Sequence, residues 1–257
     1  MLKQIAWEIK MSKVVAVAGK GGVGKTTFAA LLIRYLIEER KISPVLALDL
    51  DPNSNLNKLL GVCITHTIGE ARELLKKEVP PGMTKHMWFE YKIHQAIVEG
   101  KGFDLLVMGR PEGPGCYCAA NSIAKQSIET LKKNYKFIVI DNEAGMEHMS
   151  RLVTQNVDCL YILSDPTPRG LETAHRMIGL IDELNLNIKE FYIIVNRVKP
   201  ERTEELFMLS EKKGIKINGI IREDEYLIEA DTEEVSIFGL KDYALSLTDA
   251  YRIFEKI

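Results

Sequence analysis

The chain has no long apolar run and no strong excess of charge of either sign. No stretch approaches the roughly 18 consecutive apolar residues that a membrane-spanning helix requires, so we expect no membrane span. Lysine and arginine total 34 against 36 aspartate and glutamate residues, which gives a formal net charge of −2. This balance gives no reason to expect nucleic acid as a partner. Residues 1–10 lack the apolar core and cleavage site of a signal peptide, so we expect a cytoplasmic protein.

The length and the apolar content allow one large domain. With 257 residues and 46% apolar residues, we expect a single domain over residues 1–257. The sequence leaves open whether residues 1–12 are a flexible extension, an upstream start or an extra edge segment. Short β-branched runs alternate with segments of helical periodicity, which is typical of an α/β fold. We predict a mostly parallel, twisted sheet of seven or eight strands with helices on both faces. The predicted strands are 14–18, 45–48, 105–108, 137–140, 160–163, 192–195 and 215–221.

The segment GKGGVGKTT, residues 19–27, follows the first predicted strand and precedes a predicted helix. It matches the phosphate-loop pattern GxxxxGK[ST], in which glycines let backbone N–H groups curl around phosphate oxygens at a helix N-terminus. In this pattern Lys25 reaches the β- and γ-phosphates and the Thr26 hydroxyl ligates Mg²⁺. The sequence therefore predicts an ATP or ADP site. Its phosphate-binding residues are Gly19, Gly21, Gly22, Val23, Gly24, Lys25, Thr26 and Thr27.

Two further predicted strands end in aspartates. Asp51 follows the second strand in LALDLDPNSN, where a carboxylate near the γ-phosphate can position a nucleophile. A turn-capping or helix-capping role explains Asp51 equally well on local sequence alone. Asp141 ends the apolar run of FIVIDNEAG, a Walker B pattern whose carboxylate holds Mg²⁺, and Gly145 leaves an N–H free to contact the γ-phosphate. No role is assigned from sequence to Glu143, Glu147 or His148.

Asn196 and residues 165–169 follow later strands and are expected near the nucleotide base. The side-chain amide of Asn196 can bond an adenine edge, although asparagine at a strand end is also a common turn residue. The prolines of the segment DPTPR, residues 165–169, are equally explained as loop punctuation.

Cys116 and Cys118 stand together in the loop RPEGPGCYCAAN, whereas Cys63 and Cys159 are isolated and are expected to be buried apolar residues. In an extended backbone, positions i and i+2 share a face, so both sulfurs can reach one metal ion. Two thiolates leave a soft metal under-coordinated, and a twofold axis would supply a second pair for Zn²⁺, Ni²⁺ or an Fe–S cluster. Two inert thiols remain an alternative, and a disulfide between them is disfavoured by geometry.

The segment KGGVGKTT resembles the deviant Walker A of the ATPase class that includes septum-site, arsenite-pump and nitrogenase-iron-protein ATPases. In that class the early lysine crosses a dimer interface, so the resemblance implies a homodimer in which Lys20 acts on the partner's nucleotide. It also implies that Asp51 orients or deprotonates the attacking water and that Asn196 reads the base. With DLDPNSN and GRPEGPGCYCAANS, the chain resembles the carbon monoxide dehydrogenase nickel-insertion (CooC-type) ATPases over residues 13–198.

The resemblance implies a nucleotide-controlled metallochaperone that binds Ni²⁺, or Zn²⁺ in its place, through Cys116 and Cys118 of two subunits. The client would be a nickel–iron–sulfur enzyme, carbon monoxide dehydrogenase or acetyl-CoA synthase. Two other functions remain open. One is an ATP-dependent reductase carrying an Fe–S cluster. The other is a positioning or partition ATPase, for which the mixed charge of residues 241–257 gives no basic amphipathic helix.

Overall fold

The computed structural model describes residues 12–74, 79–110, 118–144 and 156–256. The strands are β1 (Lys13–Gly19), β2 (Val45–Asp49), β3 (Val98–Glu99), β4 (Phe103–Val107), β5 (Phe137–Asp141), β6 (Asn156–Ser164), β7 (Asn187–Val198) and β8 (Gly219–Arg222). The helices are α1 (Lys25–Glu38), α2 (Leu56–Leu60), α3 (Ile68–Leu74), α4 (Lys85–Ala96), α5 (Cys118–Lys132), α6 (Pro168–Glu183), α7 (Thr203–Lys212), α8 (Glu225–Thr232) and α9 (Leu245–Phe254), with short 3₁₀ turns η2 (Pro200–Arg202) and η3 (Ile237–Gly239).

The strands form one eight-stranded sheet in the order β3-β4-β2-β5-β1-β6-β7-β8. Every described pair of neighbours is parallel except β3 and β4, which are antiparallel. The predicted α/β fold with a mostly parallel sheet is therefore confirmed. Strand β1 lies between β5 and β6 and is parallel to both. The loops that follow these central strands therefore all lie at the same edge of the sheet.

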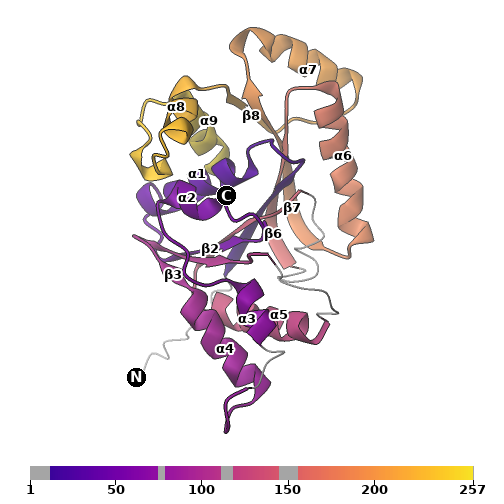
Figure 1. The fold of residues 1–257 in the computed structure, drawn as a ribbon. Coiled ribbons are helices and arrows are strands. Elements are labelled where there is room, and N and C mark those ends of the chain that lie inside the picture. Colours follow the sequence, from indigo (N-terminus) through magenta and orange to yellow (C-terminus); the bar gives the residue numbers. More distant parts are fainter. Residues whose placement is uncertain (1–11, 75–78, 111–117, 145–155, 257) are drawn as a thin grey trace, which may run out of the picture.

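Helices cover both faces of this sheet (Figure 1). The alternation of β1 assigns the faces, because Val14 and Ala16 pack with the core under α3 to α7, whereas Val15 and Val17 pack with α1, α2 and α9. Edge-to-face aromatic contacts tie the second layer together: the Phe28 ring of α1 lies 5.0 Å from the ring centroids of both Tyr161 and Phe254. This packing fixes α1, the helix that begins at the phosphate loop, against β6 and α9.

Three local expectations differ from the structure. The apolar run 215–221 contributes only β8 to the sheet, because Ile215 donates its N–H to the Ser210 carbonyl and closes the end of α7. Strand β3 was not predicted, because it spans only two residues. The charges of residues 222–234 favour a solvated face or loop over a binding tract. This segment does contain the exposed helix α8, but it also lines a pocket described below. Among the described residues, no helix is long and apolar enough to cross a membrane.

Candidate functional site: the phosphate loop and its buried carboxylates

The loop between β1 and α1 needs glycine at two of its positions. At Gly19 an added Cβ would lie 2.5 Å from the Leu163 carbonyl oxygen of β6, closer than two such atoms can pack. Gly24 is the N-cap of α1 in the left-handed conformation, with φ of 91°, and an added Cβ there would lie 2.4 Å from Nδ2 of Asn196. The loop therefore packs closely against both β6 and β7, which holds its backbone at the edge of the sheet where these strands end.

Lys25 points back over this loop and is almost completely buried, with 8% of its surface exposed. Its Nζ donates to the Lys20 carbonyl oxygen at 3.2 Å. Burial lowers the pKa of Lys25, and the negative charges of Asp141, Asp51 and Glu143 offset part of that effect. The ammonium group is thus held beside carboxylates at the edge of the sheet where the loop opens. Lys20 itself is exposed, so its side chain is accessible from outside the loop.

Asp49 and Asp141 lie side by side, because they end β2 and β5 and are paired in the register of these strands. Asp49 is fully buried and accepts hydrogen bonds from the backbone N–H groups of Asp51, at 3.0 Å, and Leu56, at 3.1 Å. Burial raises the pKa of Asp49 to about 6 despite these hydrogen bonds. Asp49 thus orders the loop that carries Asp51, a role that sequence reasoning did not assign.

Asp51 is half-buried and its carboxylate is engaged in the turn that follows. Its Oδ1 accepts from the Asn53 N–H at 2.8 Å and from Asn53 Nδ2 at 3.0 Å. This is the geometry of the turn-forming alternative. The charge of Asp51 also raises the pKa of Lys25. A contact with a nucleotide stays a prediction.

Asp141 is 1% exposed, and neither carboxylate oxygen has a hydrogen-bond partner of ordinary geometry among the described residues. Burial raises the pKa of Asp141 to about 8, the charge of Asp49 adds to the rise, and Thr26 and Lys25 lower it only in part. A buried carboxylate next to a hydroxyl is the oxygen donor set that Mg²⁺ takes beside a phosphate. Asp141 and Thr26 therefore fit the predicted magnesium site.

Asn196 contacts the phosphate loop from the end of β7. Its Nδ2 donates to the Val23 carbonyl oxygen at 2.8 Å, and its Oδ1 accepts from the Arg197 N–H at 2.9 Å. One amide hydrogen remains for a base, so the predicted base contact stays open. The segment 165–169 does not line the pocket beside Asn196; Asp165 accepts from the N–H of Thr167, at the start of α6.

A pocket of about 350 Å³ adjoins Gly24, Thr27 and Asn196 and extends under α8. Its far wall consists of the strand end Arg222 to Asp224 and the turn from Ile237 to Leu240. Sequence reasoning missed this wall because the segment 222–234 reads as a run of solvated charge. Asp224 anchors this wall and is only 5% exposed. Its carboxylate caps α8 by accepting from the Tyr226 N–H, at 3.0 Å, and it also accepts from the Ser246 N–H of α9, at 2.8 Å.

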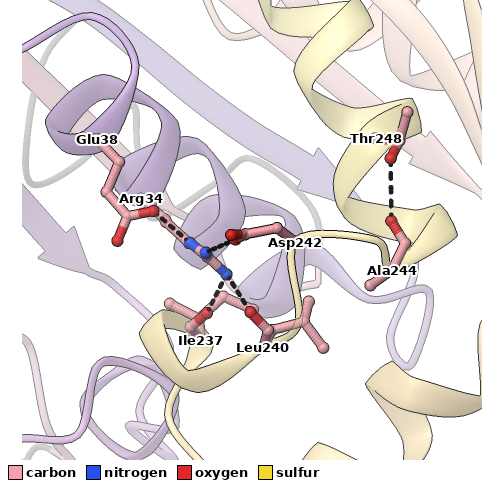
Figure 2. A network of polar contacts seen from close by, with 7 residues as sticks. All are labelled: Arg34, Glu38, Ile237, Leu240, Asp242, Ala244 and Thr248. Atoms are coloured by element: carbon pink, nitrogen blue, oxygen red, sulfur yellow. Dashed lines mark hydrogen bonds and ion pairs between the residues drawn. The ribbon is translucent and has the colours of Figure 1, made fainter.

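Arg34 of α1 fixes the turn that closes this pocket (Figure 2). Its Nη1 donates to the carbonyl oxygens of Ile237, at 3.0 Å, and Leu240, at 2.8 Å. The rest of the guanidinium group pairs with Glu38, at 2.6 Å, and Asp242, at 2.7 Å. The helix that begins at the phosphate loop thus also positions the opposite wall of the pocket.

Three predicted site residues fall partly or wholly outside the described residues. These are Gly145, Cys116 and the side chain of Cys118, whose backbone begins α5. Within the described ranges no group of three or more metal-ligating side chains occurs. Of the two isolated cysteines, Cys159 is buried as expected, whereas Cys63 is exposed, contrary to expectation.

The chain is similar to several known proteins in sequence and in fold. An uncharacterized ATP-binding protein of Methanocaldococcus jannaschii is 43% identical over 249 residues, covering 95% of this chain and 98% of that protein. Carbon monoxide dehydrogenase accessory protein CooC of Rhodospirillum rubrum is 31% identical over 242 residues, covering 88% of this chain and 89% of CooC. The solved structure of the MinD cell division protein of Aquifex aeolicus matches with a TM-score of 0.69 at 23% identity, covering 95% of this chain and 96% of that one, and shows the shared fold.

The family described as CbiA, the CobQ/CobB/MinD/ParA nucleotide binding domain, matches residues 14–237. That segment begins in β1 and ends at η3, so it contains the phosphate loop, both buried carboxylates and Asn196. The match covers most of the chain, and the phosphate loop carries a buried lysine at position 25. The chain therefore belongs to the CobQ/CobB/MinD/ParA family of P-loop ATPases.

Proposed function

We propose that this protein hydrolyses ATP to ADP and phosphate and uses that reaction to control a homodimer that carries nickel. ATP hydrolysis is supported by the position of Lys25 in the phosphate loop, beside Asp141, which pairs with Asp49 in the sheet. Membership of a nucleotide-binding family supports it. The second part rests on the Cys-x-Cys sequence and on the CooC relative.

In the proposed reaction, the loop N–H groups of residues 19–27 bind the phosphates and Lys25 neutralises charge on the β- and γ-phosphates. Asp51 orients the attacking water, whose oxygen bonds to the γ-phosphorus as the bond to the β–γ bridging oxygen breaks. Thr26 and Asp141 would hold Mg²⁺, which when bound supplies positive charge against the phosphates. Gly145 would contact the γ-phosphate through its N–H. The adenosine part would occupy the pocket beside Asn196 and Thr27, where apolar side chains such as Leu227 and Leu240 contact a base.

The proposed dimer makes Lys20 a residue of the partner's site. Its exposure is compatible with contact across an interface, whereas Lys25 is buried in its own subunit. A twofold axis would also bring together two copies of Cys116 and Cys118, which gives four sulfur ligands for Ni²⁺, or for Zn²⁺ in its place. If ATP stabilises the closed dimer, linkage requires that ATP also raises the affinity for a metal that only the dimer binds.

The proposed client is an enzyme with a nickel–iron–sulfur centre, because the CooC relative is named as an accessory protein of carbon monoxide dehydrogenase. A second candidate is a positioning or partition ATPase, which the likeness to MinD favours: a septum site-determining MinD of Bacillus subtilis is 26% identical over 234 residues. Helix α9 is largely buried against the sheet, so it is not a free amphipathic segment for a membrane. An Fe–S-bearing reductase is the third reading, and an absorbance spectrum of anaerobically purified protein separates it from a nickel carrier.

The cargo is tested by replacing its ligands. We expect Cys116→Ala and Cys118→Ala to abolish stoichiometric binding of Ni²⁺ and Zn²⁺ while leaving MgATP binding intact. Cys63→Ala is the matched control, because Cys63 is an exposed free thiol remote in sequence from the loop. Metal titration by calorimetry, with nucleotide binding measured on the same samples, decides the question. Unchanged metal binding in either loop variant would remove nickel from the proposal and leave the partition ATPase as the better reading.

A further inference from the structure

Two neighbouring side chains at the end of β7 hold consecutive carbonyl groups of the phosphate loop from outside. Arg197 Nη1 donates to the Gly22 carbonyl oxygen at 3.1 Å, and Asn196 Nδ2 donates to the Val23 carbonyl oxygen at 2.8 Å. These contacts link positions more than 170 residues apart in the sequence. The end of β7 and the loop are thus joined by two side-chain hydrogen bonds rather than by sheet pairing.

The backbone of β7 is distorted where this happens. Its register with β8 shifts between Val195 and Val198, and Arg197 adopts a left-handed conformation with φ of 58°. This conformation is uncommon for residues other than glycine, asparagine and aspartate. Its consequence is that Arg197 turns out of the strand and reaches the loop with its guanidinium group. The distortion therefore serves the contact, because a regular strand would alternate its side chains between the two faces of the sheet.

The two contacts bear on anion binding through the planarity of the peptide group. In a trans peptide the C=O of one residue and the N–H of the next point in opposite directions. Holding the Gly22 carbonyl outward therefore directs the Val23 N–H inward, and holding the Val23 carbonyl outward directs the Gly24 N–H inward. Gly22 has a φ of 78° and no atom within 4 Å of an added Cβ, so no side chain at this position limits the backbone conformation. The contact from Arg197 supplies that restriction.

We propose that Arg197 is a positioning residue that arranges the phosphate loop for binding before the nucleotide arrives. This rests on the proposed binding of nucleotide at the loop. Arg197 acts by pre-organisation: a loop already held in its binding conformation loses less freedom when the β-phosphate enters. The effect falls more on the phosphates than on adenosine, because the two held peptides lie in the loop, whereas Arg197 is one of many residues that line the adenosine pocket.

The variant that tests this is Arg197→Asn, because asparagine accepts the left-handed conformation and removes only the guanidinium group. Arg197→Lys keeps the charge on a flexible stem with a single donor centre. Lys199→Asn is the matched control: it removes the same charge two residues further on, where the lysine pairs with Glu223 at 3.8 Å and not with the loop. Affinities for ADP and for adenosine are measured by displacement of a fluorescent ADP analogue, and the melting temperature of each nucleotide-free protein is recorded.

We expect Arg197→Asn to weaken ADP binding about three- to tenfold, since one exposed, charge-assisted hydrogen bond is lost. Because Arg197 also lines the adenosine pocket, adenosine binding should weaken as well, but by a smaller factor than ADP binding. Arg197→Lys should recover part of the ADP loss, and Lys199→Asn should match the wild type. Unchanged ADP affinity in Arg197→Asn, or equal losses for adenosine and ADP, would overturn the inference. Failure of the wild-type protein to bind ADP at all would instead overturn the proposed function on which it rests.

Discussion

Asp141 offers a quantitative test, because it is a buried carboxylate with no hydrogen-bond partner of ordinary geometry among the described residues. We expect Asp141→Asn to stabilise the nucleotide-free protein while removing magnesium-dependent hydrolysis. Burial raises the pKa of this carboxyl from 3.8 to about 8. The folded state therefore keeps the proton up to about pH 8 while the unfolded state releases it near pH 4, so the unfolded state binds fewer protons in this window. The free energy of unfolding must then fall as the pH rises between these two values.

The magnitude follows from the size of the shift. Each pH unit within the window costs about 1.4 kcal/mol, so the penalty for Asp141 reaches roughly 1.5 kcal/mol at pH 5 and about 4 kcal/mol at pH 7. These values are ceilings for the gain in Asp141→Asn, because the amide is a buried polar group as well. The advantage of the variant should accordingly grow by about 2.5 kcal/mol between pH 5 and pH 7, because the cost of burying the amide does not change with pH.

The assay is urea unfolding followed by circular dichroism at pH 5 and pH 7, in EDTA and without nucleotide. Asp182→Asn, on the exposed surface of α6, is the control and should change stability by less than about 0.5 kcal/mol at both pH values. Adding MgADP should stabilise the wild type more than Asp141→Asn, because the variant lacks the carboxylate that would ligate the cation at position 141. A variant that is less stable than the wild type at both pH values, or whose advantage does not change with pH, would refute the reasoning.

Other predictions concern the two lysines, the pocket wall and Asp51. Lys20→Ala and Lys25→Ala should both lose hydrolysis, but only Lys25→Ala should badly weaken nucleotide binding by the monomer; equal losses in a nucleotide titration would argue against Lys20 acting on the partner's site. Arg34→Met should lower the free energy of unfolding by about 2–3 kcal/mol, because the Ile237 and Leu240 carbonyls lose their donor, and urea unfolding beside the exposed control Arg252→Met checks this. Asp51→Asn should reduce kcat about 10²-fold or more with little change in ATP affinity, and an unchanged kcat would leave Asp51 with its turn-forming role alone.

The sequence predicted the sheet and the phosphate loop because both depend on local rules. Apolar runs of strand length and the glycines at 19 and 24 are visible without knowing any contact. Asp49 could not be distinguished from Asp51 in this way, because its burial follows from its pairing with Asp141 across β2 and β5. The same limit applies to Arg197, whose function depends on an irregularity in β7 and on a loop far away in the sequence.

The pocket wall around Asp224 was hidden for a related reason. A run of charged residues predicts a solvated surface, and α8 indeed has no buried residue. The wall arises only when Asp224 folds inward onto Ser246 of α9 and Arg34 holds the turn at Ile237. Such contacts combine three separate elements, and periodicity within one segment carries no information about them.

The central claim, a nucleotide-controlled dimer that binds nickel, is tested most directly by titrating Ni²⁺ into the protein without nucleotide, with ADP and with ATP, while measuring the mass of the complex. We expect tight binding of one Ni²⁺ per dimer only where the mass is that of a dimer, with the Ni²⁺ affinity and the dimer fraction changing together between the nucleotide states. Nickel binding to a monomer, or a dimer that binds no Ni²⁺ in any nucleotide state, would contradict the claim.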